Sequence, residues 1–258
     1  MNLAINLHLL RVGVLAVYFA ASNAAADLPS AITRVKPSVV IVGLYKETNN
    51  PRFTLRGTGF VAADGNLAVT NAHVLPEPAT LDAETRIAVQ VRTGQNDLQV
   101  RMATVVEIDK LHDLALLKFD GAAVPKLVVR DSDTVQEGQA IAFMGFPIGG
   151  ALGYSAVTHR GVVSSRTAIA LPPANSRQLD ARTLRSLREG SFDIFQLDAT
   201  AYPGNSGGPM FDADTGDVLG VVNLVFIKGT KESALTNPSG ISYAIPSRYV
   251  LELLRRRN

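Results

Sequence analysis

Ser206 lies inside a glycine-rich stretch, GNSGGP at residues 204–209. Glycines on both sides of a serine let the backbone turn tightly and leave the hydroxyl group exposed. They also let neighbouring backbone amides point at one spot, as a serine nucleophile with an oxyanion hole requires. A glycine-rich turn between two strands would explain the same residues. The chemical interpretation therefore depends on finding partners for Ser206 elsewhere in the chain.

A serine nucleophile needs a general base, which is usually histidine, and the chain contains four. His8 lies in a leader-like N-terminal segment, His112 directly precedes an aspartate, and His159 lies within a β-rich run. His73 ends the run NLAVTNAHV, where the junction of a strand with a loop can present its ring to a cleft. A lone histidine is more often structural than catalytic, but its position makes His73 the expected base.

A third residue must be a carboxylate that orients the imidazole ring. Asp113 begins the apolar run DLALLKF, and a carboxylate at such an edge is costly to bury unless hydrogen bonds compensate it. An aspartate in a turn before a strand is the simpler alternative. The chain order His73, Asp113, Ser206 is nevertheless that of chymotrypsin-type enzymes and differs from the orders of subtilisins and α/β-hydrolases.

Short β-rich runs must position these residues. The runs are rich in Val, Ile, Phe and Thr and are separated by Gly, Pro, Asn and Asp, which predicts strands and turns. A dozen short strands with few helices indicate an all-β sandwich or barrel. The predicted strands are residues 38–44, 57–62, 66–71, 86–92, 99–108, 113–119, 126–130, 139–145, 154–164, 193–198, 218–226 and 241–245.

A loop around residues 121–138 divides the strands into two sets of similar size, which suggests two barrel halves, roughly 33–125 and 126–250. One helix is predicted at the C-terminus, beginning at Pro246 and Ser247. Residues 171–190 interrupt the strand pattern, and their arginines at helical spacing are typical of a solvated helix face. We expect this segment to be a mobile regulatory loop near the catalytic cleft.

The N-terminus contains a short apolar run, residues 12–21, followed by small residues at Ala24 and Ala26. Ten apolar residues are too few to cross a bilayer, so the pattern favours a signal peptide over residues 1–26. An uncleaved anchor or a buried strand is the alternative. We expect no membrane span in the mature chain, residues 27–258, and a periplasmic or secreted location.

The composition excludes several other classes. Hydrophobic residues make up 47% of 258 residues and the net charge is +2, which predicts a packed core and argues against disorder and nucleic-acid binding. The chain has no cysteine, so disulfides and thiolate chemistry are excluded. The histidines lack zinc-site spacing, and residues 145–150 (GFPIGG) lack the ending of a phosphate loop. We expect neither a metal nor a cofactor.

Three segments, TNAHV (70–74), HDLALLK (112–118) and GNSGGP (204–209), resemble the signature blocks of trypsin-like serine proteases of the HtrA/Deg (Do-like) family. Further blocks, such as GTGFV at 57–61, extend the resemblance over about residues 33–250. It implies two perpendicular six-stranded β-barrels with a cleft between them and a C-terminal helix. It also implies a serine endopeptidase that acts on unfolded protein or peptide substrates, in quality control or regulated proteolysis of the cell envelope.

The resemblance also implies a role for each site residue. His73 would be the general base, Asp113 its orienter and Ser206 the nucleophile. The backbone amides of Gly204 and Ser206, with Asn205 between them, would form the oxyanion hole. Digestive trypsin-like enzymes carry an aspartate at the position of Asn205, so activation by a newly freed N-terminal ammonium is not expected here.

The chain departs from the family in two other respects. Well-known members carry PDZ domains after the protease, whereas this chain stops at Asn258 after one predicted helix, so we expect no PDZ-dependent substrate capture within it. Residues 166–192 are longer than the usual activation loop. Relatives are often trimers, so a homo-oligomer is expected from the resemblance alone. A chaperone-like or regulatory binding protein that uses the fold without turnover is the competing hypothesis.

The implied fold also assigns a primary specificity pocket. The sixth residue before the nucleophile lies at its base, and here that residue is Thr200, which is uncharged. Val222, Asn223 and Leu224 would form its wall, with Asn223 as the polar residue. This mainly apolar pocket predicts cleavage after Val, Ala or Ile rather than after Arg or Lys. Asp198 would favour basic residues if the loop folded differently.

Overall fold

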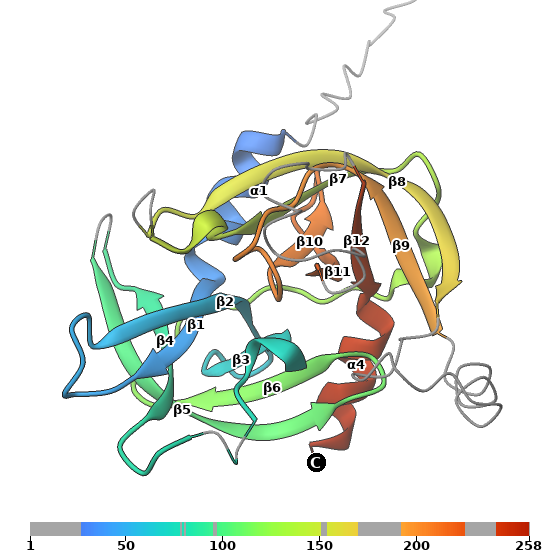
Figure 1. The fold of residues 1–258 in the computed structure, drawn as a ribbon. Helices are drawn as coiled ribbons and strands as arrows, with labels where there is room; N and C mark the ends of the chain where they lie inside the picture. Colours follow the sequence, from blue (N-terminus) through green and yellow to red (C-terminus); the bar gives the residue numbers. More distant parts are fainter. Residues whose placement is uncertain are drawn as a thin grey trace, which may run out of the picture.

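Six antiparallel strands close into a barrel in the first half of the chain, in the order β1-β2-β3-β6-β5-β4 (Figure 1). The computed structural model describes residues 27–77, 79, 81–94, 97–150, 154–169, 192–224 and 241–257. The strands of this barrel are β1 (Val39–Tyr45), β2 (Phe53–Ala62), β3 (Leu67–Asn71), β4 (Arg86–Arg92), β5 (Leu98–Asp109) and β6 (Leu114–Phe119).

A second barrel follows in the order β10-β11-β12-β9-β8-β7. Closed barrels leave no free sheet edge, which satisfies the strand backbones without further cover. The strands of this barrel are β7 (Ala140–Gly145), β8 (Val157–Ile169), β9 (Phe192–Asp198), β10 (Pro209–Asp212), β11 (Val218–Asn223) and β12 (Ile241–Pro246).

Two closed six-stranded barrels with a C-terminal helix confirm the predicted fold class. Two strand predictions were wrong. Residues 126–130 connect the barrels and make only an isolated bridge, between Val129 and Val218. Strand β10 was missed because it is only four residues long and begins at the end of the glycine-rich stretch, so it does not form a separate β-rich run.

Two α-helices lie at the ends of the described chain, and each packs on the barrel that is remote from it in sequence. Helix α1 (Leu28–Val35) was not predicted; its Arg34 donates hydrogen bonds to the carbonyls of Asp214 and Thr215, in the β10–β11 turn. Helix α4 (Ser247–Arg256) follows β12 but packs against β5 and β6 of the first barrel as well as β11 (Figure 1).

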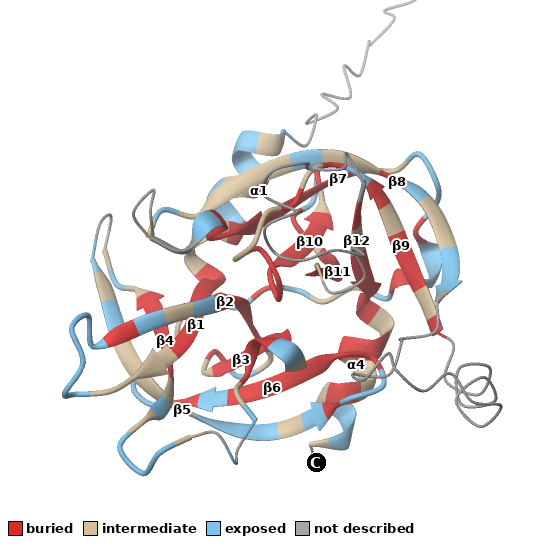
Figure 2. Ribbon diagram, in the orientation of Figure 1, coloured by how far each residue is buried: buried red, intermediate tan, exposed pale blue. Residues whose placement is uncertain are grey.

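Short 3₁₀ turns link these elements: η1 (Lys36–Ser38), η2 (Ala72–Val74), η4 (Ser132–Thr134) and η5 (Pro147–Gly150). Buried residues concentrate inside the two barrels and along the inner face of α4 (Figure 2). In the described part of the chain, no helix is long and apolar enough to cross a membrane. The predicted signal peptide and most of the predicted regulatory loop, residues 170–191, lie outside the described residues.

Candidate active site

His73 and Asp113 form a tightly coupled pair at one end of the first barrel. His73 lies in η2, directly after β3, and Asp113 directly precedes β6, the strand paired with β3. Nδ1 of His73 lies 2.6 Å from Oδ2 of Asp113, and the backbone amide of His73 donates to Oδ1 at 2.8 Å. The carboxylate therefore fixes both the ring and the backbone of His73 and leaves Nε2 to face a reacting group.

The backbone of Asp113 has an unusual conformation that other residues hold in place. Its φ is +52°, in the left-handed region that few non-glycine residues other than Asn and Asp adopt. The carbonyl of Asp113 accepts hydrogen bonds from the amide of Ala72 and from Nδ2 of Asn71, both at 3.0 Å. These two bonds bind the turn before β6 to the end of β3, so the strand pairing itself sets the relation between base and carboxylate.

Asn223 completes the environment of the carboxylate from the second barrel. It is fully buried at the end of β11, and its Nδ2 donates to Oδ2 of Asp113 at 2.6 Å. Asn223 was predicted to supply the polar side chain of a pocket wall. The structure directs the side-chain amide of Asn223 at Asp113, a contact that sequence analysis did not anticipate. Its place in a pocket wall stays a prediction.

Strand β2 brings Ser206 to this pair. The amide of Thr58 donates to the carbonyl of Ser206 at 2.9 Å. A side-chain carbon built on the neighbouring Gly57 would lie 2.9 Å from that carbonyl oxygen and 2.7 Å from a methyl group of Val74. Ser206 and Val74, the residue that follows His73, therefore both pack against Gly57, and a glycine is needed for this close approach.

The loop around Ser206 also requires its glycines. Gly207 has a φ of +86°, and a side-chain carbon on it would overlap the carbonyl oxygen of Thr58. Its amide donates to the carbonyl of Val222, and the amide of Val222 donates to the carbonyl of Gly208, both at 2.9 Å. The loop is thus pinned between β2 of one barrel and β11 of the other.

Two amides in this loop can stabilise an oxyanion. Within the described chain, the backbone amides of Gly204 and Ser206 donate no hydrogen bond. The carbonyl of Pro203 accepts from the amide of Ile148 at 2.7 Å, which turns the Gly204 amide to the opposite side of the same peptide plane. Thr58 Oγ1 anchors the carbonyl of Gly204 at 2.6 Å. The loop therefore presents two free donors next to Ser206, as an oxyanion hole requires.

His159 supports the residue between those two amides. Its ring stacks on Phe143, and its Nε2 lies 3.3 Å from Nδ2 of Asn205. Burial lowers the pKa of His159, so its ring is held neutral and Nε2 can accept a hydrogen bond from Asn205. His159 thus contacts the loop of residues 204–208 that carries Ser206, which we call the nucleophile loop, and is not a second candidate for the base.

His112 forms a second histidine–aspartate pair, which is structural. Its Nδ1 lies 2.8 Å from Oδ2 of Asp109, and its ring stacks on Tyr249 of α4 with centroids 3.9 Å apart. Burial raises the pKa of Asp109, but hydrogen bonds from His112 and the charge of Arg256 outweigh that effect and lower it. Because His112 immediately precedes Asp113, this pair connects α4 to the turn that contains Asp113.

The other predicted pocket residues lie in the second barrel. Thr200 is half-buried. Oγ of Ser242 accepts a hydrogen bond from the amide of Ala201 and donates one to the carbonyl of Ala199, both at 2.8 Å, so the residues on both sides of Thr200 are fixed. Val222 is fully buried in the barrel core, and Leu224 packs against the same cluster. Asp198 is exposed at the end of β9.

The described residues contain no group of three or more histidine and carboxylate side chains that could hold a metal ion. The side chains close to Ser206 are those of an acid–base and hydrogen-bonding site. This arrangement can activate a hydroxyl group, stabilise a developing oxyanion and protonate a leaving group.

A family model described as "trypsin-like peptidase domain" matches residues 57–221. The chain belongs to the trypsin-like peptidase family. Among curated relatives, this chain is 28% identical over 233 residues to serine protease HTR4 of Bos taurus, covering 88% of this chain and 40% of the relative. It is 30% identical over 238 residues to serine protease HTRA3 of Rattus norvegicus, covering 90% of this chain and 44% of the relative.

Solved structures of HtrA-type proteases share the fold of this chain. The HtrA-type protease AlgW with tripeptide has a TM-score of 0.63 and 26% identity, covering 89% of this chain and 62% of that chain. The serine endoprotease from Yersinia pestis has a TM-score of 0.62 and 26% identity, covering 90% of this chain and 66% of that chain. The chain spans less than half the length of these two curated relatives, and its homologues are HtrA serine proteases.

Sequence analysis missed three contacts at the site. Thr58 binds the carbonyl of Gly204, Asn223 binds the carboxylate of Asp113, and His159 binds the side chain of Asn205. The block GTGFV contained Thr58, but nothing in its composition indicates that the hydroxyl bridges two barrels. These roles arise from contacts between residues far apart in the chain.

Proposed function

We propose that the protein is a serine endopeptidase that hydrolyses peptide bonds of protein substrates through a covalent acyl-enzyme. The observation that carries the proposal is the contact of 2.6 Å between His73 and Asp113, together with the packing of Ser206 and Val74, the residue after His73, against the same glycine, Gly57. No cofactor is needed for this chemistry, because the nucleophile, the base and the oxyanion donors are all side chains or backbone groups of the chain.

In the proposed mechanism each group has one task. Oγ of Ser206 attacks the scissile carbonyl carbon while Nε2 of His73 takes its proton, and Asp113 stabilises the imidazolium that forms. The amides of Gly204 and Ser206 bind the oxyanion of the tetrahedral intermediate. His73 then gives its proton to the departing amine. A water molecule, activated by the same ring, hydrolyses the ester and restores Ser206.

The physiological role is proposed from likeness. The HtrA homologues and the signal-peptide pattern of residues 1–26 support an exported enzyme that acts on unfolded proteins of the cell envelope. Thr200 is uncharged, and its neighbours Ala199 and Ala201 lie in one apolar cluster with Val222 and Leu224, which supports cleavage after small or medium aliphatic residues. An apolar pocket discriminates by only about 1–3 kcal/mol per methylene, so we expect a graded preference.

A fluorophosphonate probe tests the proposal directly. We expect it to label folded wild-type protein at Ser206 and to leave Ser206→Ala unlabelled. In cleavage assays, Ser206→Ala and His73→Ala should each lose up to about 10⁶-fold in kcat while retaining the wild-type circular dichroism spectrum. Folded wild-type protein that takes up no probe would instead indicate a binding protein that uses the fold without turnover.

Cleavage-site profiling on a denatured proteome, with Ser206→Ala as the control, tests the proposed specificity. We expect Val, Ala and Ile to be enriched immediately before the cut. Dominant cleavage after Arg or Lys would overturn this expectation and assign the selectivity to Asp198.

A further inference from the structure

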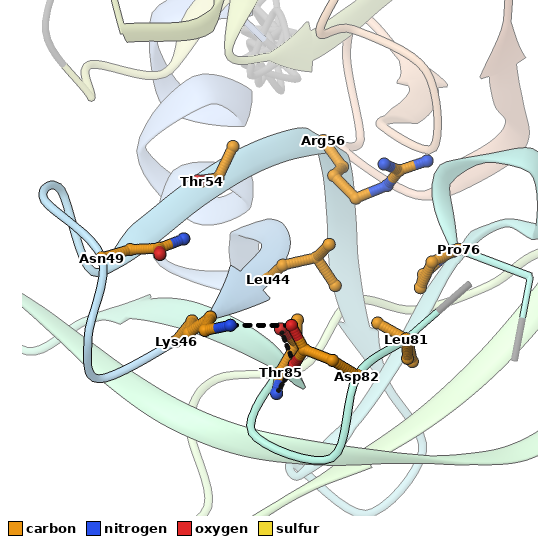
Figure 3. A pocket seen from close by; sticks show the side chains of 9 residues that line it. All are labelled: Leu44, Lys46, Asn49, Thr54, Arg56, Pro76, Leu81, Asp82 and Thr85. Atoms are coloured by element: carbon orange, nitrogen blue, oxygen red, sulfur yellow. Dashed lines mark hydrogen bonds and ion pairs between the residues drawn. The ribbon is translucent and has the colours of Figure 1, made fainter. Parts of the chain in front are cut away.

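A cavity of about 400 Å³ lies on the first barrel, close to the catalytic pair. Figure 3 shows its walls: Thr54 and Arg56 come from β2, Leu44 from β1, and Pro76 and Leu81 from the segment that follows His73. The residues that line it are Leu44, Lys46, Asn49, Thr54, Arg56, Pro76, Leu81, Asp82 and Thr85. None of them takes part in the site described above.

Arg56 connects the cavity to the catalytic residues. Its Nε donates to the carbonyl of Val74 at 2.6 Å, and Val74 follows His73 directly. Arg56 also precedes Gly57, the residue that packs against the carbonyl of Ser206. The cavity therefore adjoins the general base on the first barrel, whereas Gly204 and Asn205 belong to the second.

This position determines which part of a substrate can reach the cavity. The oxyanion hole holds the carbonyl of the scissile bond, and His73 protonates the amine that leaves. The chain on the C-terminal side of the scissile bond must therefore leave the site past His73. An extended peptide advances about 3.3 Å per residue, and Pro76 is the third residue after His73. The second or third residue after the scissile bond is thus placed at the cavity.

The charges around the cavity are unevenly compensated. Nζ of Lys46 is paired with Asp82 at 2.7 Å and with Glu84 at 3.6 Å. Arg56 is exposed and uses Nε on a neutral carbonyl, and no carboxylate among the described residues pairs with its guanidinium. Its two terminal nitrogens can therefore bind a carboxylate in bidentate fashion, which lysine cannot do. Leu44, Pro76 and Leu81 provide an apolar wall for an aliphatic stem.

We propose that this cavity binds the second or third substrate residue after the scissile bond and that Arg56 selects a carboxylate at that position. The inference rests on the proposed peptidase function and adds a substrate preference to it. The carboxylate can belong to an Asp or Glu side chain or to the C-terminus of a short substrate. Arg56 is then a specificity-determining residue that contacts substrate outside the primary pocket.

Fluorogenic peptides with valine before the scissile bond test the proposal. One series carries Glu, Gln or Lys at the second and third positions after the bond, and a second series carries Gln there with either a free or an amidated C-terminus. We expect wild-type kcat/KM to be about tenfold higher for Glu than for Gln and lowest for Lys. A preference for the free C-terminus in the second series would identify the chain end as the source of the carboxylate.

Substitutions of Arg56 assign the preference to its side chain. Arg56→Gln should bring the ratio of kcat/KM for the Glu and Gln peptides close to one, and Arg56→Lys should retain part of it. Arg52→Gln is the matched control, because Arg52 is an exposed arginine of the same β1–β2 hairpin that pairs only with Glu47 among the described residues. Added salt should weaken the wild-type ratio by screening, which provides a second readout if Arg56→Gln does not fold.

The outcomes separate this inference from the proposed function. Wild-type enzyme that cleaves all peptides of both series equally well would overturn the carboxylate preference and leave the peptidase function intact. A preference that persists in Arg56→Gln, or that is unaffected by both Arg56→Lys and salt, would also overturn it. Failure to cleave any peptide, together with failure of the fluorophosphonate to label Ser206, would instead contradict the peptidase function.

Discussion

At the scale of single residues, the carboxylate of Asp113 collects donors from both barrels. The amide and ring of His73 and the side chain of Asn223 all bind it, and the carboxylate is nine-tenths buried in that setting. A buried charge is tolerated only when such bonds replace its lost hydration. Because Asn223 contacts Asp113, we predict that it is a positioning residue, which acts through that carboxylate.

Replacing Asn223 by alanine should lower kcat with little change in KM. A hydrogen bond to a charged group contributes about 1.5–3 kcal/mol, which corresponds to a loss of about 10–150-fold if it is fully expressed in the transition state. Asn223→Asp keeps the shape but places a second carboxylate against Asp113, and we expect it to be less active still. Steady-state kinetics of the two folded variants check this. An Asp variant with wild-type kcat would show that the contact does not matter.

His159 predicts a pH dependence of stability. Burial lowers its pKa in the folded protein, so the unfolded chain binds a proton more readily. The stability that the neutral ring contributes is fully present above the ordinary histidine pKa of about 6.5 and is lost as the pH falls from there through the lowered folded value. The carboxyl groups of Asp109 and Asp212, whose pKa values are also lowered, change charge only in more acidic solution.

Urea unfolding between about pH 8 and pH 5, which brackets that histidine pKa, measures the effect. The wild type should lose more stability over this interval than His159→Gln, which keeps an acceptor for Asn205 and does not titrate. Parallel curves for the two proteins would show that His159 contributes nothing to the pH dependence.

At the scale of elements, β2 acts as the support of the nucleophile loop. Thr58 on β2 receives the amide of Phe146 at Oγ1, donates from Oγ1 to the carbonyl of Gly204, and binds the carbonyl of Ser206 through its amide. One residue of the first barrel thus binds the nucleophile loop of the second barrel at two positions, the carbonyls of Gly204 and Ser206. The precision of the site depends on this single strand.

Thr58→Val should disturb the loop while preserving the volume of the side chain. It leaves the carbonyl of Gly204 and the amide of Phe146 without their partner, at about 1–3 kcal/mol for each buried group left unsatisfied. We expect a lower melting temperature and a kcat reduced by about tenfold or more, since oxyanion donors are sensitive to displacement. Thr104→Val, the same change at an exposed position of β5, is the control and should alter neither quantity.

Local patterns in the sequence predicted most of these elements. Alternating β-rich runs and turn residues located eleven of the twelve strands that the structure describes, because strand periodicity is a local property. Strand β10 was missed because it begins at Pro209, the last residue of the glycine-rich stretch, and the apolar residues within 126–130 (KLVVR) indicated a strand where the chain only connects the barrels. Helix α1 has a mixed eight-residue sequence beginning next to the predicted cleavage site, so it carried no clear periodic signal.

The site was predictable where residue types alone indicate chemistry, as for Ser206, His73 and Asp113. It was not predictable where a role depends on tertiary contact. Asn223 and His159 acquire their partners only when the barrels close, and no pattern near them in the sequence names Asp113 or Asn205.

At the scale of the whole molecule, Tyr249 of α4 joins the two barrels. Its ring stacks on His112 of the first barrel and meets Phe192 of the second edge-on, and its hydroxyl oxygen accepts a hydrogen bond from the amide of Asp193. The side chain therefore lies where the turn that contains Asp113, strand β9 and helix α4 meet. Its loss should affect stability before it affects the chemistry.

Tyr249→Ala should destabilise the protein by about 3–5 kcal/mol, as is usual for deleting a buried aromatic ring. Each kcal/mol lowers the melting temperature of a domain of this size by about 2–4 °C, so calorimetry will resolve the change. Tyr249→Phe keeps the stacking and loses only the hydroxyl group, at a cost of about 1 kcal/mol. Equal melting temperatures for the two variants would contradict a bridging role for the ring.

The division of the site between the two barrels has a consequence for protein synthesis. A growing chain that has completed the first barrel contains His73 and Asp113 but neither Ser206 nor Asn223. Domains fold from the N-terminus as they leave the ribosome, and the second barrel closes only when β12 pairs with β9. Helix α4, which follows β12, then packs beside the turn that contains Asp113. We therefore expect nascent chains to stay inert towards themselves and towards other newly made proteins until β12 has been made.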